Sequence, residues 1–340
     1  MKAEKLIYFL SVILTKIINF RKDFEQIKVK NILIIKLDDA GDMVYATPVF
    51  KLIKQKYPES KTTLWCKNAT SELIKHDPFL DFIITKKEQL EQKYDLILDL
   101  RGNIESLKYA FLHPPKIRLD RGTIRLKNKL KGQHPHEIQT NFEIIKILID
   151  DAHTELQPEI YYSKYEENLA QKYIAENNLE KFAVLHVGAN KKLRKWPLEN
   201  YAALANILKN QYQLDLIFVG NTQDMEDIAQ VKSRLEFKTY AVAGNFSWTQ
   251  YAALVKKAAL FVGNESGPLH VAAAMGTPLV GLFGPGEPRI FYPYGEKSTF
   301  VHHVLTCNPC DQIHCVHLSN TCMQRINLTE VLDQIKALAI

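Results

Sequence analysis

Short apolar runs alternate with helix-like patterns along almost the whole chain, and this alternation constrains the fold more than any other feature. The runs have the length of buried strands, and the longer segments between them carry the helical period. Repeated strand–helix units of this kind form parallel sheets. The predicted strands are residues 31–36, 62–66, 95–100, 116–119, 182–187, 214–219, 261–262 and 279–283.

The strand–helix units fall into two series, which predicts two domains. A helical segment at 165–177 separates the series, and a length of 340 residues is typical of two domains. We therefore expect an α/β fold with two Rossmann-like halves, whose parallel sheets face an interdomain cleft where ligands bind. The expected organisation is an N-terminal amphipathic helix at 1–28, an acceptor-binding domain at 29–160 and a nucleotide-sugar-binding domain at 161–340.

The segment 261–285, FVGNESGPLHVAAAMGTPLVGLFGP, is the most informative single stretch. A strand end runs into a glycine-rich turn, and an alanine-rich helix follows. Ser266 suits the N-cap, and Gly276 suits the C-terminal end of the helix. Such a helix start leaves backbone N–H groups open to an anion, and the helix dipole favours negative charge there. The alternative to a phosphate site is an ordinary tight turn between a strand and a helix.

Several enzyme classes are disfavoured by what the sequence lacks. No GxGxxG follows a predicted strand, so a dinucleotide-binding dehydrogenase is disfavoured. The sequence has no Walker A motif and no His–Glu spacing of a zinc hydrolase. Four of the five cysteines fall within 307–322, which is unlike a disulfide-stapled secreted protein, so we expect a reducing, cytoplasmic location.

The N-terminal segment predicts an amphipathic helix. Residues 6–20 are mostly apolar, but the stretch is too short to span a bilayer and Lys16 interrupts it. Polar side chains recur every three, four or seven positions, and basic residues flank the helix. Two interpretations stay open: a helix on the anionic inner face of the membrane, or a helix packed on the protein. We expect the first 28 residues to be dispensable for folding.

Three blocks, at 32–58, 184–205 and 261–285, together resemble the glycosyltransferase family 9 heptosyltransferases of lipopolysaccharide core assembly. The combination consists of a strand followed by Gly41-Asp42, a basic stretch before Trp196-Pro197, and GNESGPLH. The resemblance implies the two-domain GT-B fold and sugar transfer with inversion. It also implies a nucleotide-sugar donor, usually ADP-heptose, and a lipid-linked glycan acceptor, with no nucleic-acid partner and no bound metal or cofactor.

Asp42 is the expected catalytic base. Inverting transfer is a single displacement that needs one base to take the proton of the acceptor hydroxyl. In the family the aspartate of the Gly-Asp pair has this role, and Asp42 matches it. Capping of the helix predicted at 43–57 is the alternative. Asp38 and Asp39 stand where the family more often has small hydroxyl residues, and we expect both in a solvated turn.

The basic stretch before Trp196 is expected to hold the donor diphosphate. The family has a basic residue two positions before this tryptophan, and Arg194 matches it. A cation there stabilises the charge that develops on the leaving group, whereas a solvated loop is the alternative. Glu265 replaces the usual aspartate, and His270 has a core position as its alternative. The expected donor-binding residues are Gly188, Ala189, Arg194, Lys195, Glu265, Ser266, Gly267 and His270.

Residues 116–131 carry seven basic side chains and one acid, and they suggest the acceptor site. In the acceptor-binding domain such a run attracts a phosphorylated, acidic, lipid-linked sugar, and the expected acceptor-binding residues are Arg121 and Arg125. A solvated loop is the alternative. The membrane-facing interpretation of 1–28 would bring the enzyme to that lipid.

The sequence leaves alternatives open for the role of the cysteine cluster at 307–322 and for the reaction that the protein catalyses. The cluster fits a metal site, reduced thiols packing a loop, or disulfides, since only its first spacing suits zinc. The alternatives to sugar transfer are another GT-B sugar-nucleotide enzyme, such as an epimerase, and a catalytically silent nucleotide-sugar-binding scaffold. The intact Asp42 and Arg194 argue against the silent scaffold.

Overall fold

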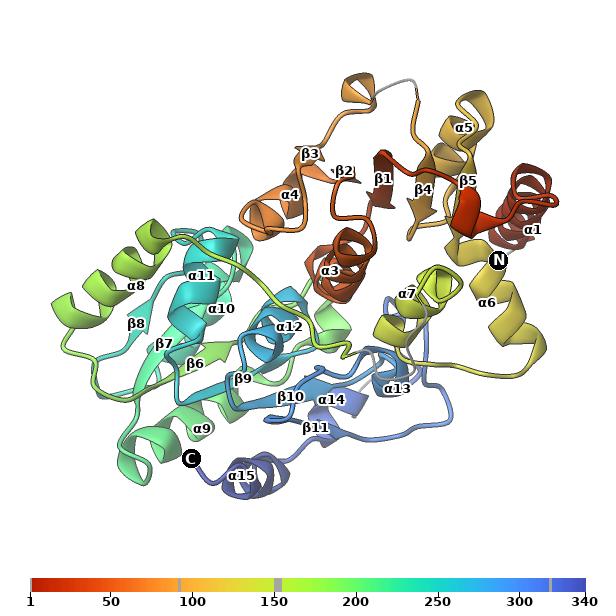
Figure 1. Ribbon diagram of the computed structural model, residues 1–340. Coiled ribbons are helices and arrows are strands. Elements are labelled where there is room, and N and C mark those ends of the chain that lie inside the picture. The colour runs from red at the N-terminus through yellow and green to blue at the C-terminus, as the bar shows by residue number, and fades with distance from the viewer. Residues whose placement is uncertain (1, 91–92, 150–154, 318–319) are drawn as a thin grey trace. The chain divides into compact units, whose positions relative to one another are not determined.

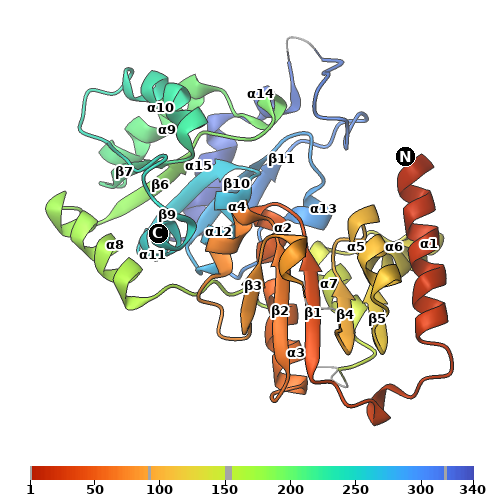
Figure 2. The same ribbon diagram turned by 90° about the horizontal axis from the view of Figure 1, so that it is seen from above.

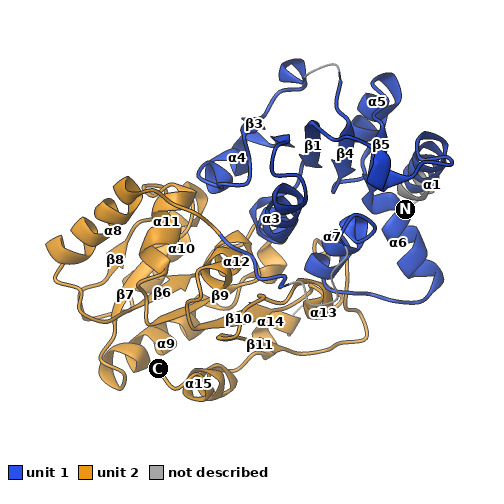
Figure 3. Ribbon diagram, viewed as in Figure 1, with its two compact units in different colours: residues 1–159 blue, residues 160–340 orange. Residues whose placement is uncertain are grey.

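The computed structural model describes residues 2–90, 93–149, 155–317 and 320–340. The chain divides into two compact units, residues 1–159 and 160–340 (Figure 3). Each unit contains one sheet, and every strand pairing described in both sheets is parallel. The predicted α/β class with parallel sheets is therefore confirmed.

Unit 1 has a five-stranded sheet in the order β3-β2-β1-β4-β5 (Figure 1). The chain moves from β1 to β2 and β3 on one side and then crosses to β4 on the other. The strand order thus reverses between β1 and β4, and ligands bind beyond the carboxyl ends of strands at such a switch point. The strands are β1 (Asn31–Lys36), β2 (Lys61–Cys66), β3 (Phe82–Ile84), β4 (Leu96–Asp99) and β5 (Ile117–Asp120), and the helices are α1 (Lys2–Ile18), α2 (Ala40–Val44), α3 (Thr47–Lys56), α4 (Asn68–Ser71), α5 (Ile104–Leu112), α6 (Arg121–Leu130) and α7 (Glu137–Ile145).

Unit 2 has a six-stranded sheet in the order β11-β10-β9-β6-β7-β8, so its switch point lies between β6 and β9. Helices α9 and α15 cover one face, and α8, α11 and α12 lie on the other (Figure 1). The strands are β6 (Phe182–His186), β7 (Asp215–Val219), β8 (Tyr240–Ala241), β9 (Leu260–Asn264), β10 (Leu279–Phe283) and β11 (Ser298–His302), and the helices are α8 (Lys164–Glu176), α9 (Leu198–Asn210), α10 (Met225–Lys232), α11 (Trp248–Val255), α12 (Gly267–Ala274), α13 (Pro288–Phe291), α14 (Cys322–Arg325) and α15 (Leu328–Ala337).

The helix start predicted in the 261–285 segment is confirmed. Ser266 is the N-cap of α12, Pro268 lies in its first turn, and Gly276 follows its end with a φ of +73°. A side chain is strained at that φ, so glycine fits there. The turn between β9 and α12 thus has the open helix start that the sequence predicts.

The N-terminal segment forms α1, which packs against unit 1 beside β5 and α6 (Figures 1 and 2). Its polar side faces the protein: the Ser11 and Thr15 hydroxyls donate to the Asp120 carboxylate at 2.8 and 2.7 Å. The helix therefore contributes buried polar contacts to unit 1. This geometry counts against the expectation that residues 1–28 are dispensable for folding, because their removal leaves Asp120 without these donors. Among the described residues, no helix is both long and apolar enough to span a bilayer.

Candidate functional site

Asp42 lies in α2, beyond the carboxyl end of β1, at the switch point of unit 1. Helix α2 ends at Val44, and α3 begins separately at Thr47 with Ala46 as its N-cap. Asp42 is therefore inside a short helix and does not cap the longer one, so the capping alternative is wrong. Asp42 as a residue is partly exposed.

Buried charges surround this position. Lys36, the last residue of β1, is fully buried, and its Nζ lies 3.1 Å from Oδ2 of Asp38 and 3.9 Å from Oε1 of Glu137. Asp38 also pairs with Arg101. The expectation that Asp38 lies in a solvated turn is wrong, because this carboxylate is 4% exposed and held by two cations.

Asp39 fits that expectation, since its side chain is 70% exposed and pairs with Lys67 at 2.7 Å. Two adjacent acids thus occupy opposite environments. Asp38 contributes to the buried cluster beside Asp42, and Asp39 faces solvent.

The buried charges set the protonation of the two site carboxylates. Burial raises the pKa of Asp42 above its usual value; Lys36 opposes this shift, and the negative charges of two neighbouring carboxylates add to it. For Asp38, burial alone would raise the pKa, but Lys36 and two arginines outweigh it and hold the pKa low. Asp42 is thus the carboxylate whose proton affinity is increased, as a general base requires.

The basic run at 116–131 is not a solvated loop. Arg118 lies in β5 and is fully buried, with Nη2 at 2.9 Å from the Asp99 carboxylate. Arg121 and Arg125 lie on α6, and both contact Glu137, at 2.7 and 3.3 Å. Arg121 is only 5% exposed, and its positive charge acts on Asp42. Arg121 therefore belongs to the buried cluster of the switch point.

In unit 2, Asn264 at the end of β9 connects the segments that carry the sequence motifs. Its fully buried amide Nδ2 donates to the carbonyls of Val187 and Gly188 at 2.9 and 3.0 Å. Its Oδ1 accepts from the Trp196 backbone N–H at 3.0 Å and from the Tyr201 hydroxyl at 3.1 Å. One side chain therefore fixes the loop after β6, the basic stretch and the turn before α12.

Arg194 lies beside the turn that begins α12. Its Nη1 is 3.5 Å from the Glu265 carboxylate, and its Nε donates to Oε1 of Gln312 at 2.7 Å. Arg194 remains 27% exposed, whereas Glu265 is 4% exposed. The structure thus brings Arg194 and Glu265 together, as expected for two residues of one site. Gln312 belongs to the cysteine-containing loop, a contact that no sequence spacing predicts.

The other expected donor residues lie around the same switch point. Ser266 Oγ is 3.1 Å from Nδ1 of the buried His186, and Gly267 opens α12 with partial exposure. His270 is 6% exposed and faces inward from α12. Lys195 Nζ contacts Asp227 on α10 at 2.6 Å. In this structure the Lys195 ammonium is therefore paired with the carboxylate of Asp227. His270 has the environment of a core histidine.

Gly188 is required by packing. A Cβ at this position would lie 2.1 Å from Oδ1 of Asp224, so any side chain would clash with that carboxylate. The Asp224 carboxylate also lies near His186, whose Nε2 is 3.8 Å from it. Burial alone would raise the pKa of Asp224, but His186 and the backbone N–H of Asn221 outweigh it and lower the pKa. Ala189, the next residue, is partly exposed.

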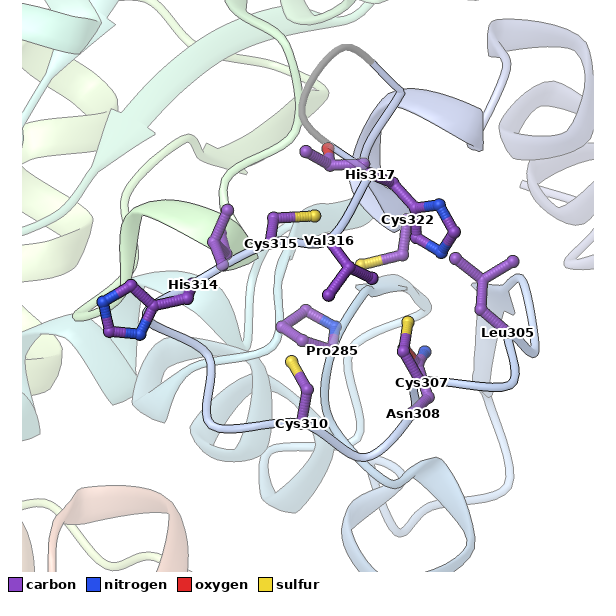
Figure 4. A pocket seen from close by; sticks show the side chains of 12 residues that line it. Pro285, Leu305, Cys307, Asn308, Cys310, His314, Cys315, Val316, His317 and Cys322 are labelled. Carbon is purple, nitrogen blue, oxygen red and sulfur yellow. The ribbon is translucent and has the colours of Figure 1, made fainter.

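The cysteines of the C-terminal loop line one pocket of unit 2 (Figure 4). All five cysteines of the chain are free thiols, so the disulfide alternative is wrong for this structure. Within the described residues, which omit 318–319 of this loop, no group of three or more His, Cys, Asp or Glu is arranged to hold a metal ion. Burial and the neighbouring Cys315 and Cys310 raise the pKa of the Cys322 thiol.

The family model of glycosyltransferase family 9 (heptosyltransferase) matches residues 84–319. The chain belongs to this family. It is accordingly a glycosyltransferase, and the match includes the Arg194, Asn264 and Glu265 segments described above.

Named relatives and solved structures agree with the family match. The lipopolysaccharide core heptosyltransferase OpsX of Haemophilus influenzae is 23% identical, over 80% of this chain and 84% of that protein. A family 9 glycosyltransferase structure from Veillonella parvula superposes with a TM-score of 0.80 at 19% identity, over 92% and 98% of the two chains. The Escherichia coli ADP-heptose lipopolysaccharide heptosyltransferase II gives 0.70 at 20% identity, over 91% and 98%. These similarities show the GT-B fold.

Sequence reasoning missed four residues that organise the two switch points: Lys36, Glu137, His186 and Asn264. Lys36 and His186 end strands β1 and β6, so their positions at the carboxyl ends of central strands were a usable signal. Asn264 was visible within GNESGP. Glu137 had no signal in the sequence, because it comes from α7 and meets Arg121 and Lys36 only in three dimensions.

Proposed function

We propose that this family 9 glycosyltransferase moves heptose from ADP-heptose to a lipopolysaccharide-core or related lipid-linked glycan, with inversion at the anomeric carbon. Two of the proteins named above support the sugar and the acceptor, since the Haemophilus influenzae and Escherichia coli proteins are lipopolysaccharide heptosyltransferases. The observation that carries the mechanism is Asp42, whose pKa is raised within the buried charge cluster of unit 1.

In the proposed reaction, the Asp42 carboxylate takes the proton of the acceptor hydroxyl while that oxygen bonds to the anomeric carbon. The bond from this carbon to the diphosphate breaks in the same displacement, and the diphosphate leaves with an added negative charge. Asp42 is ionised before the reaction and protonated after it. The neighbouring Lys36 and Arg121 keep the ionised form populated, because their positive charges oppose the shift that burial causes.

Unit 2 is proposed to bind the donor. The backbone N–H groups at Ser266 and Gly267 open α12, and the helix dipole favours a diphosphate there. Arg194 supplies the cation for the leaving diphosphate. Glu265 holds Arg194 in place, which explains why a longer acid than aspartate is compatible with the site.

Unit 1 is proposed to bind the acceptor, and the enzyme to act at the cytoplasmic face of the inner membrane, where a lipid-linked acceptor is presented. Arg121 is largely occupied by Glu137, so we assign it to the charge cluster beside the acceptor hydroxyl. Arg125 is more exposed and is the better candidate for direct contact with an acidic acceptor.

The proposed function is tested by incubating the purified protein with ADP-heptose and truncated lipopolysaccharide, followed by mass analysis of the product. A mass increase of one heptose and release of ADP are expected. UDP-sugars serve as competing donors in parallel reactions. Transfer from a UDP-sugar but not from ADP-heptose would overturn the donor, and donor turnover without a heavier acceptor would favour another sugar-nucleotide enzyme.

A further inference from the structure

Helix α1 buries polar side chains together with Ile18 and part of Leu14, and it leaves a set of large apolar side chains exposed. A surface helix normally buries its apolar stripe and exposes its polar side. In α1 the inward positions include Ser11 and Thr15, which are 1% and 8% exposed. The large apolar side chains on the other side remain in contact with solvent. This arrangement calls for an explanation, because it leaves much of the apolar surface of the helix exposed to solvent.

The inward polar stripe is held by a buried ionic network. Arg118 is fully buried, and its Nη2 donates to Ser11 Oγ at 2.9 Å while its Nη1 donates to the Ser11 carbonyl at 3.2 Å. Asp120 accepts from Ser11 and Thr15, and the Asn19 side chain donates to the Arg118 carbonyl at 2.7 Å. Rotation of α1 about its axis would break these bonds and leave buried charges unpaired. The orientation of the helix is therefore fixed.

The outward face is a continuous apolar stripe with helical spacing. Its members within α1 each lie three or four positions from another member, so they share one side of the helix. They are more exposed than a packing helix would allow, with Ile17 and Phe20 at 66% and 68%. Apolar surface gathered in this way marks a site of contact with another apolar phase. The stripe consists of Leu6, Phe9, Leu10, Ile13 and Ile17 on α1, and Phe20 in the turn that follows the helix.

Positive charge surrounds the stripe. Residues 6–22 contain no aspartate or glutamate, while Lys16, Arg21 and Lys22 are exposed. Helix α6 packs beside α1 (Figure 2) and adds the exposed Lys129 and Lys131. Exposed apolar side chains bordered by lysine and arginine are the chemistry that binds an anionic phospholipid surface.

We propose that α1 is a membrane-docking helix that inserts its apolar stripe into the interface of an anionic phospholipid bilayer and remains bonded to unit 1 through its polar stripe. The inference extends the proposed function, since a lipid-linked acceptor gives the docking its purpose. Its test needs neither donor nor acceptor, so failure of one leaves the other standing. Unlike a tethered anchor, a helix fixed by Arg118 and Asp120 holds unit 1 in one orientation on the membrane.

The experiment compares two triple variants of the full chain in vesicle sedimentation. Phe9→Gln, Ile13→Gln and Ile17→Gln together remove the stripe. Phe82→Gln, Ile147→Gln and Ile313→Gln together are the matched control, because these side chains are also exposed but lie elsewhere (49%, 66% and 62%). The vesicles are phosphatidylcholine alone, or phosphatidylcholine with about one-third phosphatidylglycerol.

We expect the wild-type protein and the control variant to bind the anionic vesicles, and added salt to weaken this binding. The stripe variant is expected to lose about tenfold or more in partitioning, because each glutamine removes an apolar side chain that the interface would bury. A Phe9→Trp variant should also show blue-shifted tryptophan emission when anionic vesicles are added. Melting temperature checks folding, and Ile17→Gln alone replaces the triple variant if the triple variant is unstable.

Three outcomes would overturn the proposal. The first is equal vesicle binding by the stripe variant and the wild-type protein, and the second is no binding of wild-type protein to anionic vesicles at low salt. The third is a wild-type dimer in light scattering that the stripe variant converts to a monomer, with no vesicle binding by either. That result would assign the stripe to an interface between two copies of the chain.

Discussion

Asp42 owes its proposed role to its surroundings more than to its residue type. Asp38, Asp39 and Asp42 lie within five positions of the sequence, yet only Asp42 combines partial exposure with a raised pKa. Asp38 is locked between two cations, and Asp39 faces solvent. The sequence and the family resemblance single out Asp42, but the cluster that adjusts its proton affinity comes from elements far apart in the chain.

We predict that Asp42→Asn removes nearly all transfer, by about 10²–10⁴-fold in kcat, because general-base catalysis contributes about this factor. Donor affinity should stay within a few-fold, since the donor contacts are proposed to lie in unit 2. Steady-state kinetics and calorimetry with ADP measure the two effects. Asp39→Asn is the matched control and should transfer normally. Full activity in a folded Asp42→Asn protein would eliminate Asp42 as the base.

The pH dependence of transfer should report the raised pKa of Asp42. A base acts in its ionised form, so kcat/KM should fall as the pH drops through this pKa, at a pH above the usual 3.8. Lys36→Met removes the positive charge that opposes the shift and should move the acid limb to higher pH. Asp38→Asn removes a negative charge and should move it downward. Shifts of the same sign in both variants would contradict this account.

Arg194→Ala is predicted to weaken ADP binding and slow transfer together. The loss should be about 1.5–3 kcal/mol, the range of a charge-assisted hydrogen bond. Calorimetric titration with ADP measures the binding part. The exposed Lys191 provides the control, and Lys191→Ala should bind ADP almost normally. Unchanged ADP affinity in Arg194→Ala would show that the arginine only braces Glu265 and Gln312.

At the scale of elements, the sequence predicted the central strands well because each is a run of buried apolar residues. In β1, Ile32 to Ile35 are all fully buried, which is typical of a parallel strand covered on both faces. The strands that the sequence missed are β3, β8 and β11, which lie at sheet edges. β3 and β8 have only three and two residues, and β11 is largely half-buried, so none shows a continuous apolar run.

Helix α1 shows what a sequence pattern cannot predict. Its apolar and polar stripes were visible in the sequence, but which stripe faces the protein depends on Arg118 and Asp120, about 100 residues further along the chain. The sequence alone did not distinguish the buried Arg118, which pairs with Asp99 and Asp120, from a basic residue in a solvated run. Long-range pairing of this kind leaves no periodic signal.

Thr15→Val is predicted to destabilise unit 1 by about 2–3 kcal/mol, because it removes the donor to Asp120 and a contact of Arg118 while their charges stay buried. Urea unfolding measures the change. The comparison variant is Ile17→Gln, two residues away on the exposed face, which should stay within about 0.5 kcal/mol of wild type. A neutral Thr15→Val would mean that the polar stripe does not anchor the helix.

At the scale of the whole molecule, the contribution of Asp77 to stability should fall between acid and neutral pH. Burial raises the pKa of Asp77 to about 7. The carboxyl is protonated in the folded protein below this pH, whereas in the unfolded chain it ionises near 3.8. Its stabilising protonated form is therefore fully present below pH 3.8 and is lost as the pH rises through 7.

We predict that this carboxyl lowers the free energy of unfolding by about 2–3 kcal/mol between pH 5 and pH 8. Asp77→Asn should remove this part of the pH dependence, because the amide oxygen can still accept the Phe79 N–H that now reaches Asp77 at 2.9 Å. Urea unfolding at both pH values tests it, with Asp39→Asn as an exposed control. An unchanged pH slope in Asp77→Asn would assign the effect to other groups.

The separation in sequence between α1 and its partners has a consequence for synthesis on the ribosome. Ser11 and Thr15 emerge first, but Asp120 follows them by 109 and 105 residues. At a synthesis rate of about 5–20 residues per second, roughly 5–20 seconds pass between synthesis of the helix and synthesis of the strand that it packs against. During that interval both of its stripes are without their partners, so the nascent chain carries a cationic, apolar segment that a membrane or a chaperone can bind before unit 1 has folded.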